Sequence, residues 1–293
     1  MKHGICLTPI YPQAIRNYSL MAELLEKISN RKLFNCVEVY FEGTKEEQYM
    51  FKNTLKDKDL EAVYLGGLPI KRDAIDISAA DEIRRQKSVD ACKIHLERAL
   101  NMGCRKIVIA SGPDWEKDGC QEKIAEQIRK SLNELEKCCR KEELQISLVP
   151  FPVSTEPYLA VGNVKLVQEI FQAESFQNVG ITFDTSHFSQ LGENVEKSFE
   201  VLMPWIHHVH LANCVMKDKT SPLYGDKHPV FSQEGGDFSV ESIKKFYDRT
   251  ILGKTQNRID ICSVEIASRG NEDWYYDETC KEAKKIWEEY SER

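Results

Sequence analysis

The sequence predicts an α/β protein with a single (β/α)8 TIM barrel, and two observations lead to this class. Eight short apolar runs rich in Val and Ile alternate with longer segments in which apolar residues recur every three or four positions. No Pro/Gly/Ser-rich linker, low-complexity tract or change of composition divides the chain. With 293 residues, 41% of them apolar, it can bury a barrel-sized core, and we expect residues 1–293 to form one domain.

The eight apolar runs are the expected strands. In chain order they are His3–Leu7, Cys36–Phe41, Ala62–Leu65, Lys106–Ala110, Gln145–Val149, Val179–Phe183, His207–Leu211 and Ile259–Glu265. Helical periodicity is clear in Ala80–Met102 and Glu122–Glu143, which lie between strands. Gly103 follows the first of these helices and ends it just before the fourth strand.

Composition excludes several classes of protein. The formal charge of −7 comes from interspersed acids and bases, with no basic stripe for nucleic acid. No apolar stretch approaches the roughly twenty residues that span a bilayer. The ten cysteines follow no signal peptide, and the adjacent pair Cys138 and Cys139 lacks the spacing of a zinc or redox motif. We therefore expect a cytoplasmic protein with free thiols.

Candidate metal ligands gather in one part of the sequence. Five of the seven histidines lie between residues 187 and 228, a stretch that also holds Asp226 and begins just after Asp184. Asp184 ends the sixth strand, His210 is late in the seventh, and Glu265 ends the eighth. Since the carboxyl ends of barrel strands meet at one rim, these three side chains should lie within a few ångströms of one another. Imidazoles and carboxylates together suit a divalent metal.

Several segments together resemble a known family. They match in order and spacing the sugar isomerase/epimerase group of xylose isomerase-like TIM barrels, with endonuclease IV as a distant relative. The segments that carry the resemblance are Val37–Tyr40, Ala110–Asp114, Gly180–His187, His208–Val215, Pro222–Pro229 and Val264–Glu265.

The resemblance implies a divalent ion, which could be manganese, cobalt, magnesium or zinc, and a small sugar or polyol substrate. By the family pattern Asp184, His210 and Glu265 hold the ion, and Glu265 also moves a proton at a sugar carbon. His187 takes a catalytic position beside the substrate. The expected substrate contacts are Asp226, His228, Ser111 and Glu156. In the multi-zinc nucleases the residues corresponding to His187, Asp226 and His228 contact further metal instead, an alternative that stays open.

The fifth strand departs from the family pattern. Relatives carry a glutamate there, followed by proline, phenylalanine and polar residues, whereas this chain has Val149 and continues Pro150–Val153. Valine cannot bind a metal or carry a proton, so the pair of opposed carboxylates needed for epimerisation is broken. A single-base reaction remains open, and the metal should bind more weakly than at a four-ligand site. Glu156 is the nearest residue that could replace the missing carboxylate.

Three function classes follow. The first is a metal-dependent isomerase, epimerase or related lyase; the second is a non-catalytic or binding relative of that family; the third is a multi-zinc nuclease-like hydrolase. Barrels of this size often form homodimers, which the sequence neither supports nor excludes.

Structural interpretations remain open for several of these residues. Asp184 could cap a helix that starts at the strand end. Glu38 should point into the barrel, where we interpret it as paired or hydrogen-bonded in a polar layer rather than catalytic. His208 and His210 share one face of a strand, and a histidine in such an alternating position is usually a satisfied core or rim residue.

Overall fold

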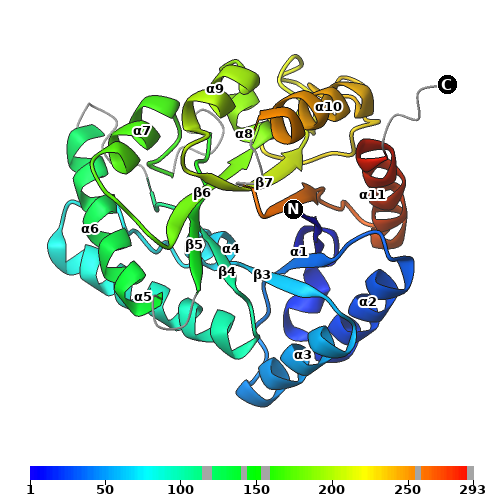
Figure 1. Cartoon of the computed structure of the whole chain (residues 1–293), viewed down its shortest axis with the longest axis horizontal. Helices are drawn as coiled ribbons and strands as arrows, with labels where there is room; N and C mark the ends of the chain where they lie inside the picture. The colour runs from blue at the N-terminus through cyan, green and yellow to red at the C-terminus, as the bar shows by residue number, and fades with distance from the viewer. Residues whose placement is uncertain (114–120, 140–143, 153–158, 255–258, 289–293) are drawn as a thin grey trace.

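A computed structural model of the chain shows a closed barrel of eight parallel strands in the order β1 to β8. It describes residues 1–113, 121–139, 144–152, 159–254 and 259–288. The strands lie side by side around the centre of the molecule, with the helices outside them (Figure 1). Their bounds are Lys2–Cys6, Cys36–Val39, Glu61–Leu65, Lys106–Ile109, Gln145–Leu148, Val179–Asp184, Ile206–Ala212 and Ile261–Glu265. The predicted fold class and all eight strands are confirmed, with ends that differ by one or two residues.

The helices follow the strands in alternation. They are α1 (Leu7–Ile10), η1 (Pro12–Arg16), α2 (Tyr18–Arg31), α3 (Lys45–Asp57), α4 (Gly67–Arg72), α5 (Glu82–Asn101), α6 (Gln121–Cys139), α7 (Val164–Gln172), α8 (Thr185–Gln190), α9 (Val195–Leu202), α10 (Val240–Phe246), η3 (Tyr247–Leu252) and α11 (Glu272–Trp287). The predicted helices Ala80–Met102 and Glu122–Glu143 correspond to α5 and to α6, although residues 140–143 lie outside the described part. No helix among the described residues is long and apolar enough to cross a membrane.

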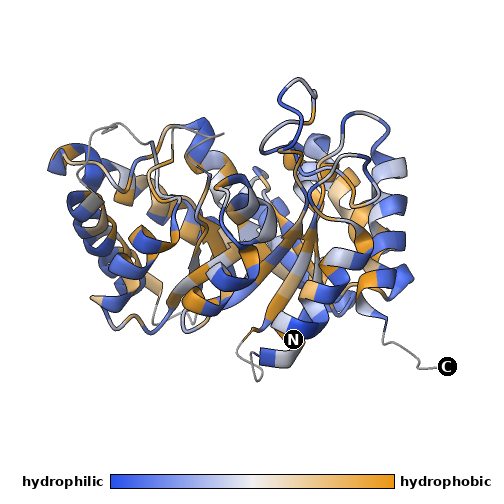
Figure 2. Cartoon of the chain, turned by 90° about the horizontal axis from the view of Figure 1, so that it is seen from above, coloured by the Kyte–Doolittle hydropathy of each residue, from blue (hydrophilic) through white to orange (hydrophobic). Residues whose placement is uncertain are grey.

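Sequence patterns explain why these elements form. Most strand residues are buried, as expected for parallel strands covered by helices on one side and a filled interior on the other. The helices carry apolar residues on the face that meets the strands, and their outer faces are hydrophilic (Figure 2). Side-chain caps fix several helix starts; at α3, Thr44 and Glu47 form a reciprocal capping box. The nine cysteines in the described ranges are all free, as predicted.

The barrel interior is narrow and holds polar side chains as well as apolar ones. At Gly4 in β1, an added Cβ would lie 2.1 Å from the Ser263 hydroxyl of β8, so only glycine fits there. Glu38 of β2 reaches His208 and His210 of β7 across the interior. This inward direction of Glu38 is the one that strand alternation predicts.

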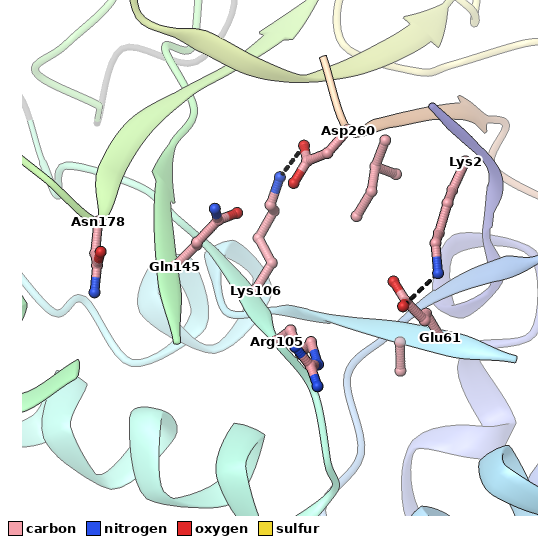
Figure 3. A pocket seen from close by; sticks show the side chains of 9 residues that line it. Lys2, Glu61, Arg105, Lys106, Gln145, Asn178 and Asp260 are labelled. Atoms are coloured by element: carbon pink, nitrogen blue, oxygen red, sulfur yellow. Dashed lines mark hydrogen bonds and ion pairs between the residues drawn. The ribbon is translucent and has the colours of Figure 1, made fainter. Parts of the chain in front are cut away.

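At the amino-terminal end of the barrel, charged and polar residues line a recess of about 410 Å³ (Figure 3). Lys106, almost fully buried, donates to Asp260 Oδ1 at 2.7 Å, and Lys2 pairs with Glu61. Burial lowers the pKa of Lys106 despite the nearby Asp260 carboxylate. These ion pairs bridge strands at the end of the barrel opposite the mouth, where side chains serve stability rather than chemistry.

Candidate metal and substrate site

Asp184, the last residue of β6, uses its two carboxylate oxygens differently. Oδ1 accepts hydrogen bonds from the backbone N–H groups of Ser186 and His187, at 2.8 and 3.2 Å, and thereby caps α8. Oδ2 is buried and has no hydrogen-bond partner among the described residues. Helix capping and cation binding, both left open by the sequence, are therefore compatible, because the cap occupies only one oxygen.

Strand register brings Asp184, His210 and Glu265 together at the carboxyl-terminal mouth. Asp184 is level with His210, and Ala212 is level with Glu265 on the next strand. His210 Nδ1 lies 2.7 Å from Glu265 Oε2 and 3.7 Å from Asp184 Oδ2. One ligand atom from each of the three residues lies within 4.8 Å of the other two. The three side chains thus converge as the order of the strands predicts.

Both nitrogens of His210 face carboxylates. Nε2 lies 3.0 Å from Glu38 Oε2, on the opposite side of the ring from Glu265. Burial alone would lower the pKa of His210, but the charges around it, Glu38 first, raise it well above its usual value. The surrounding carboxylates therefore favour a positive charge at this position, and a divalent cation near Nδ1 would compete with a proton there.

A second cluster lies beside the first, formed by His187 in α8 and by Asp226 and His228 in the loop after β7. Asp226 Oδ1 lies 2.9 Å from His228 Nε2 and 3.3 Å from His187 Nε2. The neighbouring His228 and His187 rings hold the pKa of Asp226 well below its usual range, against the effect of burial. Asp226, in turn, raises the pKa of His228 to about 10.

Hydrogen bonds outside the cluster fix the orientation of the two rings. His187 Nδ1 lies 2.8 Å from the carbonyl oxygen of Pro150, which can only accept, so Nδ1 carries a proton. Although His187 Nε2 is near Asp226, the angle there is not that of a hydrogen bond, and Nε2 has no partner within the described ranges. His228 Nδ1 is buried and equally unpartnered. Two imidazole nitrogens and one carboxylate oxygen, that of Asp184, are therefore buried and unsatisfied side by side.

The backbone at His228 is strained. Its φ of 43° lies in the left-handed region, which is uncommon for residues with a side chain. The carbonyl of His228 accepts a hydrogen bond from Ala267 N, 2.9 Å away, just after β8. This bond ties the loop to the barrel mouth and places the ring of His228 within 5.7 Å of His187, centroid to centroid. Strain held in this way is typical of ligand-binding positions.

Residues of both clusters line a cavity of about 210 Å³ at the mouth. They are His187, His210, Asp226, His228 and Glu265. The remaining lining residues are mostly apolar: Pro9, Leu65, Gly67, Leu68, Lys71, Val108, Val149, Phe151 and Ala267. A small ligand in this cavity would therefore meet both titratable groups and hydrocarbon.

The end of the fifth strand is apolar, as the sequence indicates. Val149 follows β5 directly, is 4% exposed and lines the cavity. Its backbone N–H donates to Ile109 O at 2.9 Å, which fixes it beside β4. Phe151, two residues on, packs against the ring of His187 at 4.5 Å between centroids. The described part of strand five thus offers no carboxylate to the cavity.

One predicted substrate contact, Ser111, does not line this cavity. Ser111 is buried, and its hydroxyl accepts from Val161 N at 3.0 Å, so in this structure it holds two loops together. Glu156 lies outside the described residues. Asp226 and His228, by contrast, do line the cavity.

Sequence reasoning missed the direct contact between Glu38 and His210. It expected Glu38 in a polar layer, which is correct, but assigned that layer no connection with the metal residues. The signal was present in the alternation: Glu38 points inward from β2, as His208 and His210 do from β7.

The donor set fits a divalent metal. Asp184, His210 and Glu265 offer one nitrogen and two carboxylate groups, and Asp184, His187 and His228 offer two nitrogens and one carboxylate. Zinc, manganese and cobalt accept such mixed ligands. The unsatisfied buried atoms of Asp184, His187 and His228 are observations in favour of this fit, because unpaired buried polar groups are costly.

The closed barrel and its ligand-rich mouth define a (β/α)8 protein whose site is built from the loops after the strands. The sequence model of the xylose isomerase-like TIM barrel family matches residues 31–246, and the chain belongs to this family. No curated protein sequence matches the chain.

Solved structures share the fold over nearly the whole chain. A D-tagatose 3-epimerase-like protein superposes with a TM-score of 0.72 at 19% identity, covering 98% of each chain. An IolI protein crystallised with a bound zinc atom has a TM-score of 0.72 at 16% identity, covering 98% of this chain and 96% of its own. The D-psicose 3-epimerase of Clostridium cellulolyticum H10, solved with D-tagatose, has a TM-score of 0.67 at 14% identity, with coverage of 98% and 96%. At these identities the likeness establishes the fold.

Proposed function

We propose that this protein is a metal-dependent isomerase or related lyase that moves a proton next to the carbonyl group of a small sugar or polyol derivative. The observation that carries the proposal is the convergence of Asp184, His210 and Glu265 at the barrel mouth, where His210 and Glu265 line the cavity. The family and the titles of the similar structures, which name epimerases of D-tagatose and D-psicose, support the choice of substrate class.

In this proposal Asp184, His210 and Glu265 hold the ion. A divalent ion bound there would polarise the carbonyl or hydroxyl oxygen of the substrate. Glu265 is partly exposed to the cavity, with 16% of its side chain accessible, so it can reach a substrate carbon and remove or return a proton. The ring of His187 lines the same cavity, is held by the Pro150 carbonyl, and serves to place a substrate oxygen.

Val149 decides which proton transfers are available. Epimerisation through two bases requires carboxylates on opposite faces of the carbon, and Val149 stands where the family pattern carries one of them. A reaction on one face needs only Glu265. We therefore propose a one-face proton transfer, as in aldose–ketose isomerisation or elimination, in preference to epimerisation.

The experiment follows hydrogen exchange with solvent. The chelator-treated protein, reloaded with manganese, cobalt, magnesium or zinc, is incubated with a panel of ketoses and aldoses in deuterated water. We expect uptake of deuterium next to the carbonyl without formation of the epimer, and loss of this uptake in Glu265→Gln. Uptake is measured by NMR and products by chromatography. No uptake with any metal-loaded form would indicate a non-catalytic relative, and rapid epimerisation would show that another carboxylate completes the site.

A second candidate, a nuclease-like hydrolase that uses more than one zinc ion, is favoured by one observation. The unpartnered atoms of Asp184, His187 and His228 form a three-residue group beside the first site. Metal analysis separates the candidates: two zinc ions per chain, with cleavage of a phosphodiester substrate, would support the hydrolase. The charge of −7 opposes binding to nucleic acid.

A further inference from the structure

Glu38 is a fully buried carboxylate near the mouth, as Asp184 is, and the proposed reaction gives Glu38 no task. It lies in the middle of β2, is 0% exposed, and reaches across the interior to β7. Its two oxygens contact different histidines: Oε1 lies 2.8 Å from His208 Nε2, and Oε2 lies 3.0 Å from His210 Nε2. A buried carboxylate of this kind is costly unless both oxygens are paired, as they are here.

In the contact between Glu38 and His210, the histidine is the hydrogen-bond donor. Since an ionised carboxylate only accepts hydrogen bonds, His210 must place its proton on Nε2, toward Glu38. The other nitrogen, Nδ1, then faces Asp184 and Glu265 with its lone pair whenever the ring is neutral. Of the tautomers available to the neutral ring, this is the one that can bind a cation between those carboxylates.

A chain of buried hydrogen bonds holds Glu38 in turn. His208 Nδ1 lies 3.3 Å from the hydroxyl of Thr182 in β6, and that hydroxyl lies 2.6 Å from the Ser147 hydroxyl in β5. These residues, His208 included, are fully buried. Because an ionised carboxylate only accepts, the ring of His208 donates to Glu38 from Nε2. Residues of β5, β6 and β7 thus hold the carboxylate, which β2 carries, in place without a ligand.

We propose that Glu38 is a positioning residue of the metal site: it fixes the tautomer and orientation of His210 and strengthens that ring as a ligand. The proposal rests on the metal site of the proposed function. Carboxylates that accept from the far nitrogen of a metal-binding histidine raise the basicity of the ring, and their loss costs about ten- to a hundredfold in metal affinity. The Cys6 thiol, 3.9 Å from the same nitrogen, is a weaker contact, so Glu38 is the charged acceptor there among the described residues.

The test compares metal affinity in matched variants. Zinc and cobalt dissociation constants are measured by competition with a chromophoric chelator for wild type, Glu38→Gln, Glu38→Asp and Glu136→Gln. Glu136 is the control because it is also buried, but it accepts from Gln177 N and Asn178 N at the start of β6, the other end of the barrel. We expect about tenfold weaker binding in Glu38→Gln, which keeps the volume but loses the charge. Glu38→Asp should recover part of this loss, and Glu136→Gln should bind as wild type does.

A second measurement determines which nitrogen of His210 binds the metal and which carries the proton. In zinc-loaded protein with 15N-labelled histidine, NMR should show one metal-bound Nδ1 and one protonated, exchange-protected Nε2 on the same ring, assigned to His210 through its loss in His210→Gln. In Glu38→Gln we expect that protected proton to exchange faster, a change that a loss of stability in Glu136→Gln does not produce.

The outcomes separate this inference from the proposed function. If wild type binds neither metal at millimolar concentration, the metal site itself is refuted. If wild type binds and Glu38→Gln binds equally tightly with an unchanged Nε2 proton, only the positioning role of Glu38 is refuted. If Glu38→Gln does not fold, the affinity and the NMR spectrum of Glu38→Asp decide, because an unchanged affinity and proton exchange in that shorter side chain would equally overturn the role.

Discussion

Replacing Val149 by glutamate should restore a ligand that the fifth strand lacks. The side chain lines the mouth cavity, is 4% exposed, and belongs to the strand next to β6, which carries Asp184. In the metal-free protein the new carboxylate joins three others in a largely buried space, so it should destabilise the fold by about 1–3 kcal/mol. In the metal-loaded protein it becomes a further ligand.

The size of the effect follows from linkage between binding and folding. A further carboxylate ligand should tighten metal binding by about ten- to a hundredfold, which corresponds to about 1.4–2.8 kcal/mol. At saturating metal this difference adds to the stability of the folded state. For a chain of 293 residues, 1 kcal/mol shifts the melting temperature by about 1.6 °C, so the metal-induced rise should be about 2–5 °C larger in the variant.

Thermal unfolding with and without manganese, cobalt or zinc measures this rise for wild type, Val149→Glu and Val108→Glu. Val108 also lines the cavity and is 3% exposed, but it lies on β4, one strand further from Asp184. Val108→Glu should therefore lose stability without gaining metal affinity. Equal metal-induced shifts in wild type and Val149→Glu would refute the reasoning that strand five borders the metal site.

Three further predictions concern single residues. Asp184→Asn should keep the cap of α8, because asparagine caps as well as aspartate, but should weaken metal binding at least tenfold by calorimetric titration. His228→Gln should lower the zinc content at saturation, measured by elemental analysis, only if the group with Asp184 and His187 binds a second ion; an unchanged content assigns His228 to the substrate. Glu42, held by Arg16 and Arg72, has its pKa lowered from 4.5 to about 2, against burial, by hydrogen bonds from Tyr40 and the arginines. The contribution of the ionised Glu42 to the free energy of unfolding is complete above about pH 4.5 and is lost as the pH falls to about 2. Because solvent screens the exposed guanidinium groups, we expect this contribution to be about 1–2 kcal/mol. Glu42→Gln should therefore reduce the pH dependence of the free energy of unfolding, measured with urea, by this amount. A variant with the acid dependence of wild type would contradict this last prediction.

The strands and their order could be predicted because each strand is a short apolar run, and a parallel barrel requires little else. The short helix α8 was not predicted as an element, since six residues carry too little periodicity. Its start was visible only as a capping alternative for Asp184. The sequence therefore allowed two roles for Asp184, helix capping and cation binding. Only the structure shows that Oδ1 caps α8 while Oδ2 is left for a cation.

The candidate ligands could be placed at one rim from the sequence, because register follows from strand ends. The hydrogen-bond partners that orient these ligands could not be predicted from the sequence. That the Pro150 carbonyl orients His187, or that Ala267 holds the strained backbone of His228, depends on contacts between loops that follow different strands. Loop conformation is set by such long-range contacts rather than by local pattern, which is also why Ser111 was expected at the cavity and instead joins Val161.

The two inward histidines of β7 show how depth in the barrel divides one sequence pattern into two functions. His208 and His210 lie two residues apart on the same face and share the carboxylate of Glu38. His208 is surrounded by Thr182 and the closed interior, so burial keeps it neutral, with a pKa of about 4. His210, one step nearer the mouth, also faces Glu265, and its pKa rises well above its usual value. Glu38 thus contacts both the histidine of the closed interior and the histidine at the cavity. Strand alternation places both rings on the same face and carries no information on depth, so the sequence pattern alone could not distinguish them.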